Sequence, residues 1–241
     1  MGRVAVVTGG TRGIGQAISV ALKRKGFRVA ANYAGNDTAA RQFQAETGIP
    51  IYKWDVAEYA ACEAGVTRIS HDLGPIDVLV NNAGITRDGV LHRMSKDNWD
   101  AVLRTNLDSA FNMTRLVIEG MRARGFGRVI NISSINGRKG QAGQANYSAA
   151  KAGLLGFSKA VAQENAARGV TVNVIAPGYI GTEMVQAVPK EILDTKILPL
   201  IPVGRLGSVE EIARCVTFLA ADEAAFITGA CLDANGGQYM A

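Results

Sequence analysis

The chain has 241 residues, of which 48% are hydrophobic and 20% are charged, and its formal net charge is +5. This length and apolar fraction support one domain with a substantial core, and the spread of basic residues along the chain argues against nucleic-acid binding. Two widely separated histidines and three cysteines without metal-ligand spacing argue against a metal site or a Ser-His-Asp triad.

Composition also bears on location. No apolar run approaches the ~20 residues of a membrane span, and a predicted strand begins almost at once, so we expect neither membrane association nor a signal peptide. The scattered Cys62, Cys215 and Cys231 are typical of reduced thiols. We therefore expect a cytoplasmic protein, with a mild positive charge that favours phosphate-bearing ligands.

The first predicted elements form a phosphate-binding unit. The apolar strand 4–7 leads into the run TGGTRGIG at residues 8–15, and a helix is predicted at 16–25. Glycines at this spacing allow a tight turn and a close approach to a pyrophosphate, which the N–H groups at the helix start can bind. We predict a dinucleotide site, with a ligand-free glycine turn as the alternative; its residues in this loop are Gly9, Thr11, Arg12, Gly13, Ile14 and Gly15.

The next strand, 28–32, bears on which cofactor is bound. A free ribose 2′-hydroxyl is usually held by an acid roughly 20 residues after the loop, but the strand ends in Asn32 and Tyr33. Arg12 in the loop can pair with a 2′-phosphate, although a solvated surface arginine is the alternative. We predict NADP(H), contacted by Arg12, Asn32 and Tyr33, while Asp37 leaves NAD(H) open.

Strand and helix signals alternate along the rest of the chain. Strands are predicted at 51–54, 78–81, 129–133, 170–175 and 230–233, and helices at 38–46, 59–72, 99–124, 146–168 and 209–219. This alternation predicts an α/β fold, a Rossmann-type doubly wound parallel sheet in three α/β/α layers, as a single domain over 1–241. The proline-containing segment 182–204 is expected to be irregular and to act as a substrate lid, with a mere surface excursion as the alternative.

The stretch Tyr147-Ser148-Ala149-Ala150-Lys151 carries the strongest chemical signal. A tyrosine and a lysine four residues apart lie on one face of a helix. The ammonium should lower the phenol pKa from its usual value near ~10, which would make the tyrosine a usable acid or base. A surface tyrosine stacked on a lysine stem is the alternative.

With the segments 55–56, 81–84, 105–106, 133–134 and 177–178, these motifs make the chain resemble the short-chain dehydrogenase/reductase family over essentially its whole length. The resemblance implies that Tyr147 protonates a ketone oxygen and that Lys151 lowers its pKa and binds the nicotinamide ribose. Ser134 would stabilise the developing oxyanion, and Asn106 would hold a water in a proton relay. The alternatives are a helix cap for Ser134 and a buried, satisfied amide for Asn106.

The same resemblance implies further cofactor contacts. Asp55 and Val56 would contact the adenine. The adenosine side would be lined by residues 81–84, among them Asn82, Ala83 and Gly84, and the nicotinamide carboxamide would be held by Pro177, Gly178, Ile180 and Thr182. The cofactor supplies the redox chemistry, and the protein supplies position and electrostatics.

Within the family, segments 133–144 and 177–180 resemble reductases of 3-oxoacyl thioesters. This implies NADPH-dependent reduction of acetoacetyl-CoA, or a related short 3-oxoacyl thioester, to the (R)-3-hydroxy product for polyhydroxybutyrate biosynthesis. Binding would involve Ser134, Gln141, Gln144, Tyr147 and Tyr179, with loop solvation as the alternative for both glutamines. The resemblance also implies a homotetramer, with helices 99–124 and 146–168 at the interfaces.

Three other functions remain open at this point. The first is reduction of 3-oxoacyl-[acyl-carrier-protein] in fatty acid synthesis, because both thioesters present the same pantetheine arm. Arg122, Arg124 and Arg128 could serve CoA phosphates or an acidic carrier surface, and otherwise would be solvated charges. The second is a non-catalytic NADP(H)-binding regulator on the same fold. The third is a reductase of an unrelated small carbonyl.

Overall fold

The computed structural model describes residues 2–186 and 188–240. Seven strands form one sheet in the order β3-β2-β1-β4-β5-β6-β7, and every neighbouring pair is parallel. This confirms the doubly wound parallel sheet. The strands are β1 Val4–Val7, β2 Arg28–Tyr33, β3 Ile51–Lys53, β4 Ile76–Asn81, β5 Gly127–Ile132, β6 Val170–Pro177 and β7 Cys231–Ala234.

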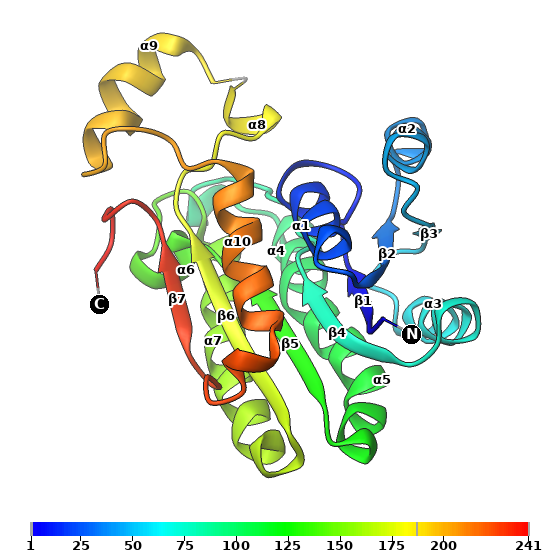
Figure 1. Ribbon diagram of the computed structural model, residues 1–241. Coiled ribbons are helices and arrows are strands. Elements are labelled where there is room, and N and C mark those ends of the chain that lie inside the picture. Colours follow the sequence, from blue (N-terminus) through cyan, green and yellow to red (C-terminus); the bar gives the residue numbers. More distant parts are fainter. Residues whose placement is uncertain (1, 187, 241) are drawn as a thin grey trace.

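Helices cover both faces of the sheet and complete three layers (Figure 1). One face carries α1 Gly13–Arg24, α2 Asp37–Thr47 and α10 Val209–Ala220, and the other carries α3 Tyr59–Leu73, α5 Ser109–Arg124 and α7 Ala145–Asn165. Alternate residues of the central strands pack into two separate apolar clusters, one under each helical layer. Such strands are apolar throughout because both of their faces are buried.

Shorter elements connect these layers. They are η1 Leu91–Arg93, α4 Lys96–Leu103, η2 Arg104–Asp108, α6 Ile135–Lys139, η3 Ala166–Arg168, α8 Glu183–Gln186, α9 Lys190–Ile192, η4 Leu193–Ile197, η5 Leu198–Leu200 and η6 Asp222–Ala224. Two of them matter for the site: η2 is a π-helical turn between α4 and α5, and α6 is a single turn that the sequence analysis missed.

The helix predicted over 99–124 differs from the observed one at its start and in its middle. It begins at Lys96, because the Ser95 hydroxyl accepts a hydrogen bond from the Asn98 N–H at 3.1 Å and caps the first turn. Its regular winding is interrupted by the wide turn η2. The Ser109 hydroxyl donates to the Thr105 carbonyl at 2.6 Å within this interruption, and π-turns of this kind are frequent at functional sites.

The segment 182–204, expected to be irregular, is largely helical: α8, α9, η4 and η5 follow one another between residues 183 and 200. Residue 187 lies outside the described residues. The prolines are compatible with these turns, because Pro189 precedes α9 and Pro199 lies in the first turn of η5, where no backbone N–H is needed. Figure 1 shows α8 and α9 standing off from the carboxyl edge of the sheet.

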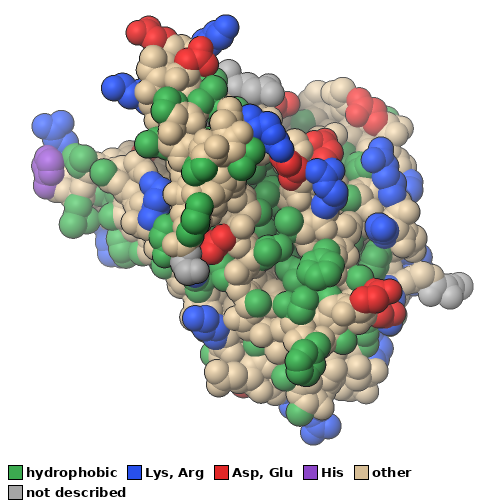
Figure 2. Space-filling model, turned by 60° about the vertical axis from the view of Figure 1, so that its left-hand side comes forward, with side chains coloured by type: hydrophobic (Ala, Val, Ile, Leu, Met, Phe, Trp, Pro, Cys, Tyr) green, Lys and Arg blue, Asp and Glu red, His purple; other side chains and the backbone are tan. Residues whose placement is uncertain are grey.

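The surface is mixed in charge. Lys and Arg side chains are interspersed with Asp and Glu over the face shown in Figure 2, and hydrophobic side chains gather between them. Among the helices of the described residues, none combines the length and the apolar character that crossing a membrane requires.

Candidate active site

The predicted site residues gather at the carboxyl edge of the sheet, where the strand order reverses between β1 and β4. Open α/β sheets bind ligands at such a switch point. The glycine loop follows β1, residues 82–84 follow β4, Ser134 follows β5 and Pro177 ends β6. Helix α7 reaches the same edge, because the Lys151 ammonium donates to the carbonyl of Ile132 at the end of β5 (2.8 Å).

The glycine loop is fastened to the end of β4. The Thr8 hydroxyl accepts from the backbone N–H groups of Asn82 (2.9 Å) and Ala83 (3.0 Å). The Asn82 amide donates in turn to the carbonyls of Thr8 (3.0 Å) and Gly9 (3.2 Å). A Cβ placed on Gly15 would lie 2.1 Å from the Gly9 carbonyl oxygen, so only glycine fits there. The loop is therefore a backbone cradle that side chains do not fill.

Asn32, a predicted cofactor contact at the end of β2, braces this loop. It is buried, its amide oxygen accepts from the Gly9 N–H (3.4 Å), and its amide nitrogen donates to the Trp54 carbonyl (3.0 Å). Both ends of the amide are thus used within the protein.

The charges beside the loop favour an anionic ligand. The carboxylate of Asp37 lies 3.0 Å from the Lys53 ammonium, and hydrogen bonds from Lys53 and then from Tyr33 lower the pKa of Asp37. The Arg12 side chain is exposed and has no ion-pair partner among residues 2–186 and 188–240. Asp37, the acid that kept NAD(H) open, is therefore a charged carboxylate already paired with Lys53, while Arg12 has no ion-pair partner in the described part of the chain.

The residues predicted to lie near the adenosine differ in burial. Asp55 is exposed and accepts from the Ala57 N–H at 2.9 Å, whereas Val56 is buried. Asn81, expected to line the adenosine, is instead buried, and its amide donates to Asn131 at 2.8 Å.

A buried polar chain continues from this pair to helix α7. The Asn131 amide donates to the Ser158 hydroxyl (2.8 Å), which donates to the Leu154 carbonyl (2.6 Å). Strands β4 and β5 are thereby tied to α7, and this tie fixes where α7 presents its tyrosine and lysine.

Asn106 lies in the π-turn η2 and is almost completely buried. Its amide donates to the Ile85 carbonyl (2.9 Å) and accepts from the Ile85 N–H (2.8 Å). The alternative weighed for this residue, a satisfied buried amide, therefore describes its side chain. A Cβ on Gly84 would lie 3.3 Å from the Asn106 amide oxygen and 3.5 Å from the Lys151 ammonium, so the loop after β4 is in contact with both residues.

Ser134 is a helix cap, which is the alternative that sequence analysis set against its catalytic role. Its hydroxyl accepts from the Asn136 N–H at 3.1 Å and caps α6, and it lies near enough to Tyr147 to stabilise the phenolate form. Burial raises the pKa of Tyr147, Ser134 opposes this rise, and the charge of Asp88 adds to it. The predicted lowering of the phenol pKa is therefore wrong for the protein alone.

Lys151 explains this difference. The side chain is buried, and its ammonium donates to the Ile132 carbonyl and lies 5.7 Å from the centre of the Tyr147 ring. Burial lowers the pKa of Lys151 to about 8. The group in this pair whose pKa falls is the lysine, because both side chains lose solvent and the ammonium is directed at a backbone carbonyl rather than at the phenol.

The residues predicted to hold the nicotinamide lie after β6. The Gly178 N–H donates to the Ala234 carbonyl at 3.0 Å, and a Cβ on Gly178 would lie 2.8 Å from the Asn235 Cα. Ile180 is buried. Thr182 reaches the glycine loop, since its Cγ2 lies 3.8 Å from the position of a Cβ on Gly13. The ends of β1 and β6 therefore face one another across the site.

The predicted substrate residues divide. The Gln144 amide accepts from the Asn136 amide (2.9 Å) and donates to Asp88 (2.8 Å), so it is a brace rather than a solvated loop residue. Gln141 is exposed and accepts from the Lys139 ammonium at 3.1 Å. Sequence reasoning missed Asp88 as a site charge, and only its place in a family-like segment could have indicated it.

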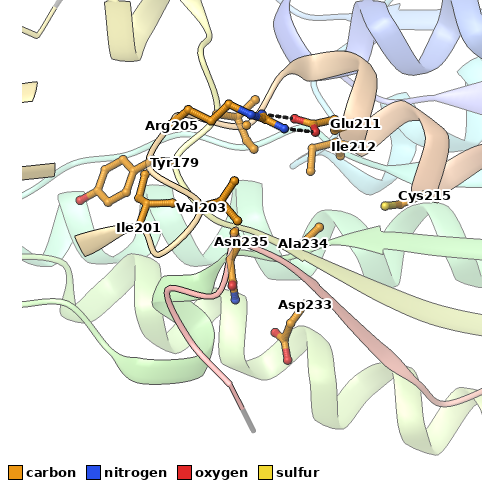
Figure 3. Close-up of a pocket in the computed structure, with 13 residues that line it drawn as sticks. Tyr179, Ile201, Val203, Arg205, Glu211, Ile212, Cys215, Asp233, Ala234 and Asn235 are labelled. Carbon is orange, nitrogen blue, oxygen red and sulfur yellow. Dashed lines mark hydrogen bonds and ion pairs between the residues drawn. The ribbon is translucent and has the colours of Figure 1, made fainter. Parts of the chain in front are cut away.

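Tyr179 lines a cavity of about 240 Å³ beside the site. Figure 3 shows Tyr179 and Cys215 at opposite ends of this cavity, with the paired Arg205 and Glu211 side chains above it. The Arg205 guanidinium contacts both carboxylate oxygens of Glu211, at 2.9 and 2.7 Å. The cavity shares Tyr179 and Ile180 with the predicted contact residues, and Ile201 and Val203 with the predicted lid.

These features fit a nicotinamide dinucleotide. The open glycine loop lies at the switch point of the sheet. Gly84 lies beside the buried Lys151, and Thr182 lies beside Gly13 of the glycine loop. Among the described residues, no group of three or more His, Cys, Asp and Glu side chains is placed to hold a metal ion.

Comparison with known proteins agrees with the fold and the site. A family profile described as enoyl-(acyl carrier protein) reductase matches residues 9–238. The chain belongs to the short-chain dehydrogenase/reductase family, whose members are oxidoreductases with a nicotinamide cofactor.

Individual relatives match over the whole chain. Acetoacetyl-CoA reductases of Shinella zoogloeoides and Rhizobium meliloti are 66% and 65% identical to it, over 100% of this chain and of each relative. A 3-oxoacyl-[acyl-carrier-protein] reductase of Salmonella typhimurium is 46% identical over 99% of this chain and 98% of the relative.

Proposed function

We propose that the protein reduces acetoacetyl-CoA, or a related short 3-oxoacyl thioester, to the (R)-3-hydroxyacyl-CoA with NADPH. The observation that carries this proposal is the similarity to three full-length relatives named acetoacetyl-CoA reductase, at 62–66% identity, against 46% for the carrier-protein enzyme. We place the reaction in the cytoplasm, within polyhydroxybutyrate biosynthesis.

The residues of the site would divide the work as follows. NADPH, when bound, supplies the hydride. Tyr147 donates its proton to the carbonyl oxygen; its raised pKa keeps the phenol protonated at neutral pH, as a donor requires. Ser134 donates a hydrogen bond to the same oxygen as negative charge develops. Lys151 holds a positive charge below pH 8 and stabilises the phenolate left behind.

The cofactor preference rests on the charges beside the glycine loop. Arg12 is exposed and unpaired among the described residues, whereas Asp37 is paired with Lys53. A 2′-phosphate would gain a charge-assisted contact from Arg12, while a free 2′-hydroxyl would meet an acid already engaged. This supports NADP(H) over NAD(H).

Two further parts of the proposal concern shape. Segment 182–204 would act as a lid, because its exposed Ile192, Leu200 and Val203 would lose contact with water if it closed.

The protein would assemble as a homotetramer through α5 and α7. Phe111 on α5 is half-exposed in the single chain, as a residue of a subunit interface would be. Light-scattering mass measurement tests the assembly.

The three candidate arginines do not discriminate between CoA and the carrier protein, because all of them are engaged within the protein. Arg128 is buried and donates to the carbonyls of Gly127 and Gly169, so the expectation that it is a solvated charge is wrong. The other two candidate arginines are also engaged: Arg122 donates to Asn165, and Arg124 to the Ile76 carbonyl. A non-catalytic regulator would not require the assembled tyrosine, lysine and serine.

The deciding experiment compares NADPH oxidation with acetoacetyl-CoA and with acetoacetyl-carrier protein, and determines the configuration of the product. We expect higher kcat/KM with the CoA ester and formation of the (R) alcohol. A kcat/KM about tenfold higher with the carrier protein, equivalent to about 1.4 kcal/mol, would replace the proposal with the carrier-protein reductase. Turnover of neither thioester would favour the regulator or an unrelated carbonyl substrate.

A further inference from the structure

Helix α6 lies directly on the backbone of α7 at the buried lysine. A Cβ placed on Gly137 of α6 would lie 2.7 Å from the carbonyl carbon of Lys151, 2.9 Å from the Lys151 Cβ and 2.9 Å from the backbone nitrogen of Ala152. Contacts below 3.0 Å are not tolerated, and backbone atoms cannot turn aside as a flexible side chain can. Any residue with a Cβ at this position would separate the two helices.

The backbone conformation gives no other reason for a glycine at position 137. Its φ is not positive, so a residue with a side chain could adopt the same conformation. The position is helical, and alanine is a better helix former than glycine. The close approach to Lys151 is therefore the physical requirement that glycine meets.

This junction controls where Ser134 lies. Ser134 caps α6 three residues before Gly137, and α6 is only five residues long. The neighbouring Ser133 hydroxyl donates to the Lys151 carbonyl at 2.7 Å, which closes the junction from the other side. A shift of α6 would carry the Ser134 hydroxyl with it, whereas α7, with 21 residues and a buried polar tie to β5, would stay in place.

We propose that Gly137 is a positioning residue of the reduction: by letting α6 pack on the Lys151 backbone, it holds the Ser134 hydroxyl beside Tyr147. The proposal rests on the proposed function for its kinetic consequence. Its structural part concerns the free protein and can be tested without substrate.

The test is Gly137→Ala, alone and combined with Ser134→Ala. In the free protein, displacement of Ser134 from Tyr147 should raise the pKa of Tyr147, read as the tyrosine ultraviolet signal that is missing in Tyr147→Phe. With acetoacetyl-CoA, kcat should fall by about 10- to 100-fold, since a misplacement of ~1 Å costs up to 10²-fold, while the Kd for NADPH stays within about twofold. In the Ser134→Ala background the same substitution should have little further effect, because both changes remove one interaction.

Gly127→Ala is the matched control. Its Cβ would lie 2.6 Å from the Met121 sulfur, at the amino end of β5 and far along the strand from Ser134. We expect this variant to lose stability yet keep the Tyr147 titration and kcat. If kcat and the Tyr147 titration change equally in Gly127→Ala and Gly137→Ala, Gly137 acts only through stability and the proposal is overturned. It is also overturned if the kcat losses of Gly137→Ala and Ser134→Ala are fully additive in the double variant.

Ser133→Ala tests the same junction if Gly137→Ala does not fold. It removes the hydroxyl that donates to the Lys151 carbonyl and adds no atoms. A smaller rise in the Tyr147 pKa supports the proposal, and an unchanged titration overturns it. If the tyrosine titration shifts as expected but neither thioester is reduced, the positioning role stands and the proposed substrate fails.

Discussion

The cofactor side and the substrate side of the carboxyl edge use their polar side chains in different ways. On the cofactor side, the side chains of Thr8, Asn32 and Asn82 bond to backbone groups of the glycine loop and of the strand end beside it, and so hold the loop in place. On the substrate side, Ser134 and Asp88 both influence the pKa of Tyr147, and the Gln144 amide donates to Asp88. The cofactor side would thus offer mainly backbone groups to its ligand, and the substrate side would offer side chains.

The difference teaches how to interpret a motif residue. A side chain that belongs to a cofactor-binding motif can act by holding the glycine loop in shape. Its loss should then weaken cofactor binding because the loop becomes less stable. A side chain named by a catalytic motif must keep a polar atom for the substrate, so its loss should change turnover and leave the fold intact. Four predictions test this division, beginning with the largest effect.

Tyr147→Phe should remove nearly all reduction while the protein folds and binds NADPH. The change deletes one oxygen, and a general acid contributes ~10²–10⁴-fold to the rate. Stopped-flow turnover and NADPH fluorescence titration measure the two properties separately. Near-normal turnover would mean that another group is the acid and that the substrate side has been misassigned.

Lys151 should give the protein a distinctive pH dependence. Its pKa is about 8 in the folded protein and 10.5 as the ordinary value, so between these pH values the unfolded state binds more protons and the free energy of unfolding rises with pH. A shift of this size corresponds to about 3 kcal/mol. Urea unfolding of wild type and Lys151→Met at several pH values should show this rise only in wild type; parallel curves would refute it.

Arg12→Ala should weaken NADPH binding far more than NADH binding. A hydrogen bond to a charged group is worth about 1.5–3 kcal/mol, so the NADPH penalty should be about tenfold or more. Because Asp37 is paired with Lys53, Asp37→Asn serves as the control and should leave the preference for NADPH in place. If Arg12→Ala weakens NADPH and NADH binding equally, Arg12 does not bind the 2′-phosphate and the assignment of NADP(H) loses its support.

The smallest effect separates the two glutamines. Gln144→Ala removes bonds to Asn136 and Asp88 and should lower the stability of the free protein by about 0.5–1.5 kcal/mol per bond. Gln141→Ala, at an exposed position, should leave stability unchanged and alter only the KM for the thioester. Thermal unfolding without ligand measures the stability of both variants, and initial-rate kinetics measure their KM. Equal stability losses in the two variants would show that Gln144 is no more a structural brace than Gln141.

The sequence predicted the sheet, its order of elements and the tyrosine, lysine and serine of the site, because these depend on local periodicity and on motifs in sequence order. It did not predict the interruption at Arg104–Asp108 or the wrapping of 182–204 into short helices, since both depend on packing and on cap geometry. The pKa of Tyr147 was predicted in the wrong direction because burial and the orientation of the Lys151 ammonium are tertiary properties. The contact of Gly137 with Lys151 joins residues fourteen apart across two helices, which no local pattern encodes.

The π-turn η2 has a consequence for how this chain tolerates changes in length. An i→i+5 turn contains one residue more than regular α-helical winding would use. Deleting a single codon within residues 104–108 should therefore heal the helix into regular winding with little rotation of one flanking helix relative to the other, while displacing Asn106 from its bonds to Ile85. Elsewhere in 96–124 such a deletion should simply damage packing. A codon-deletion scan across this helix should thus contain a narrow window in which shorter chains fold well and yet have lost their activity.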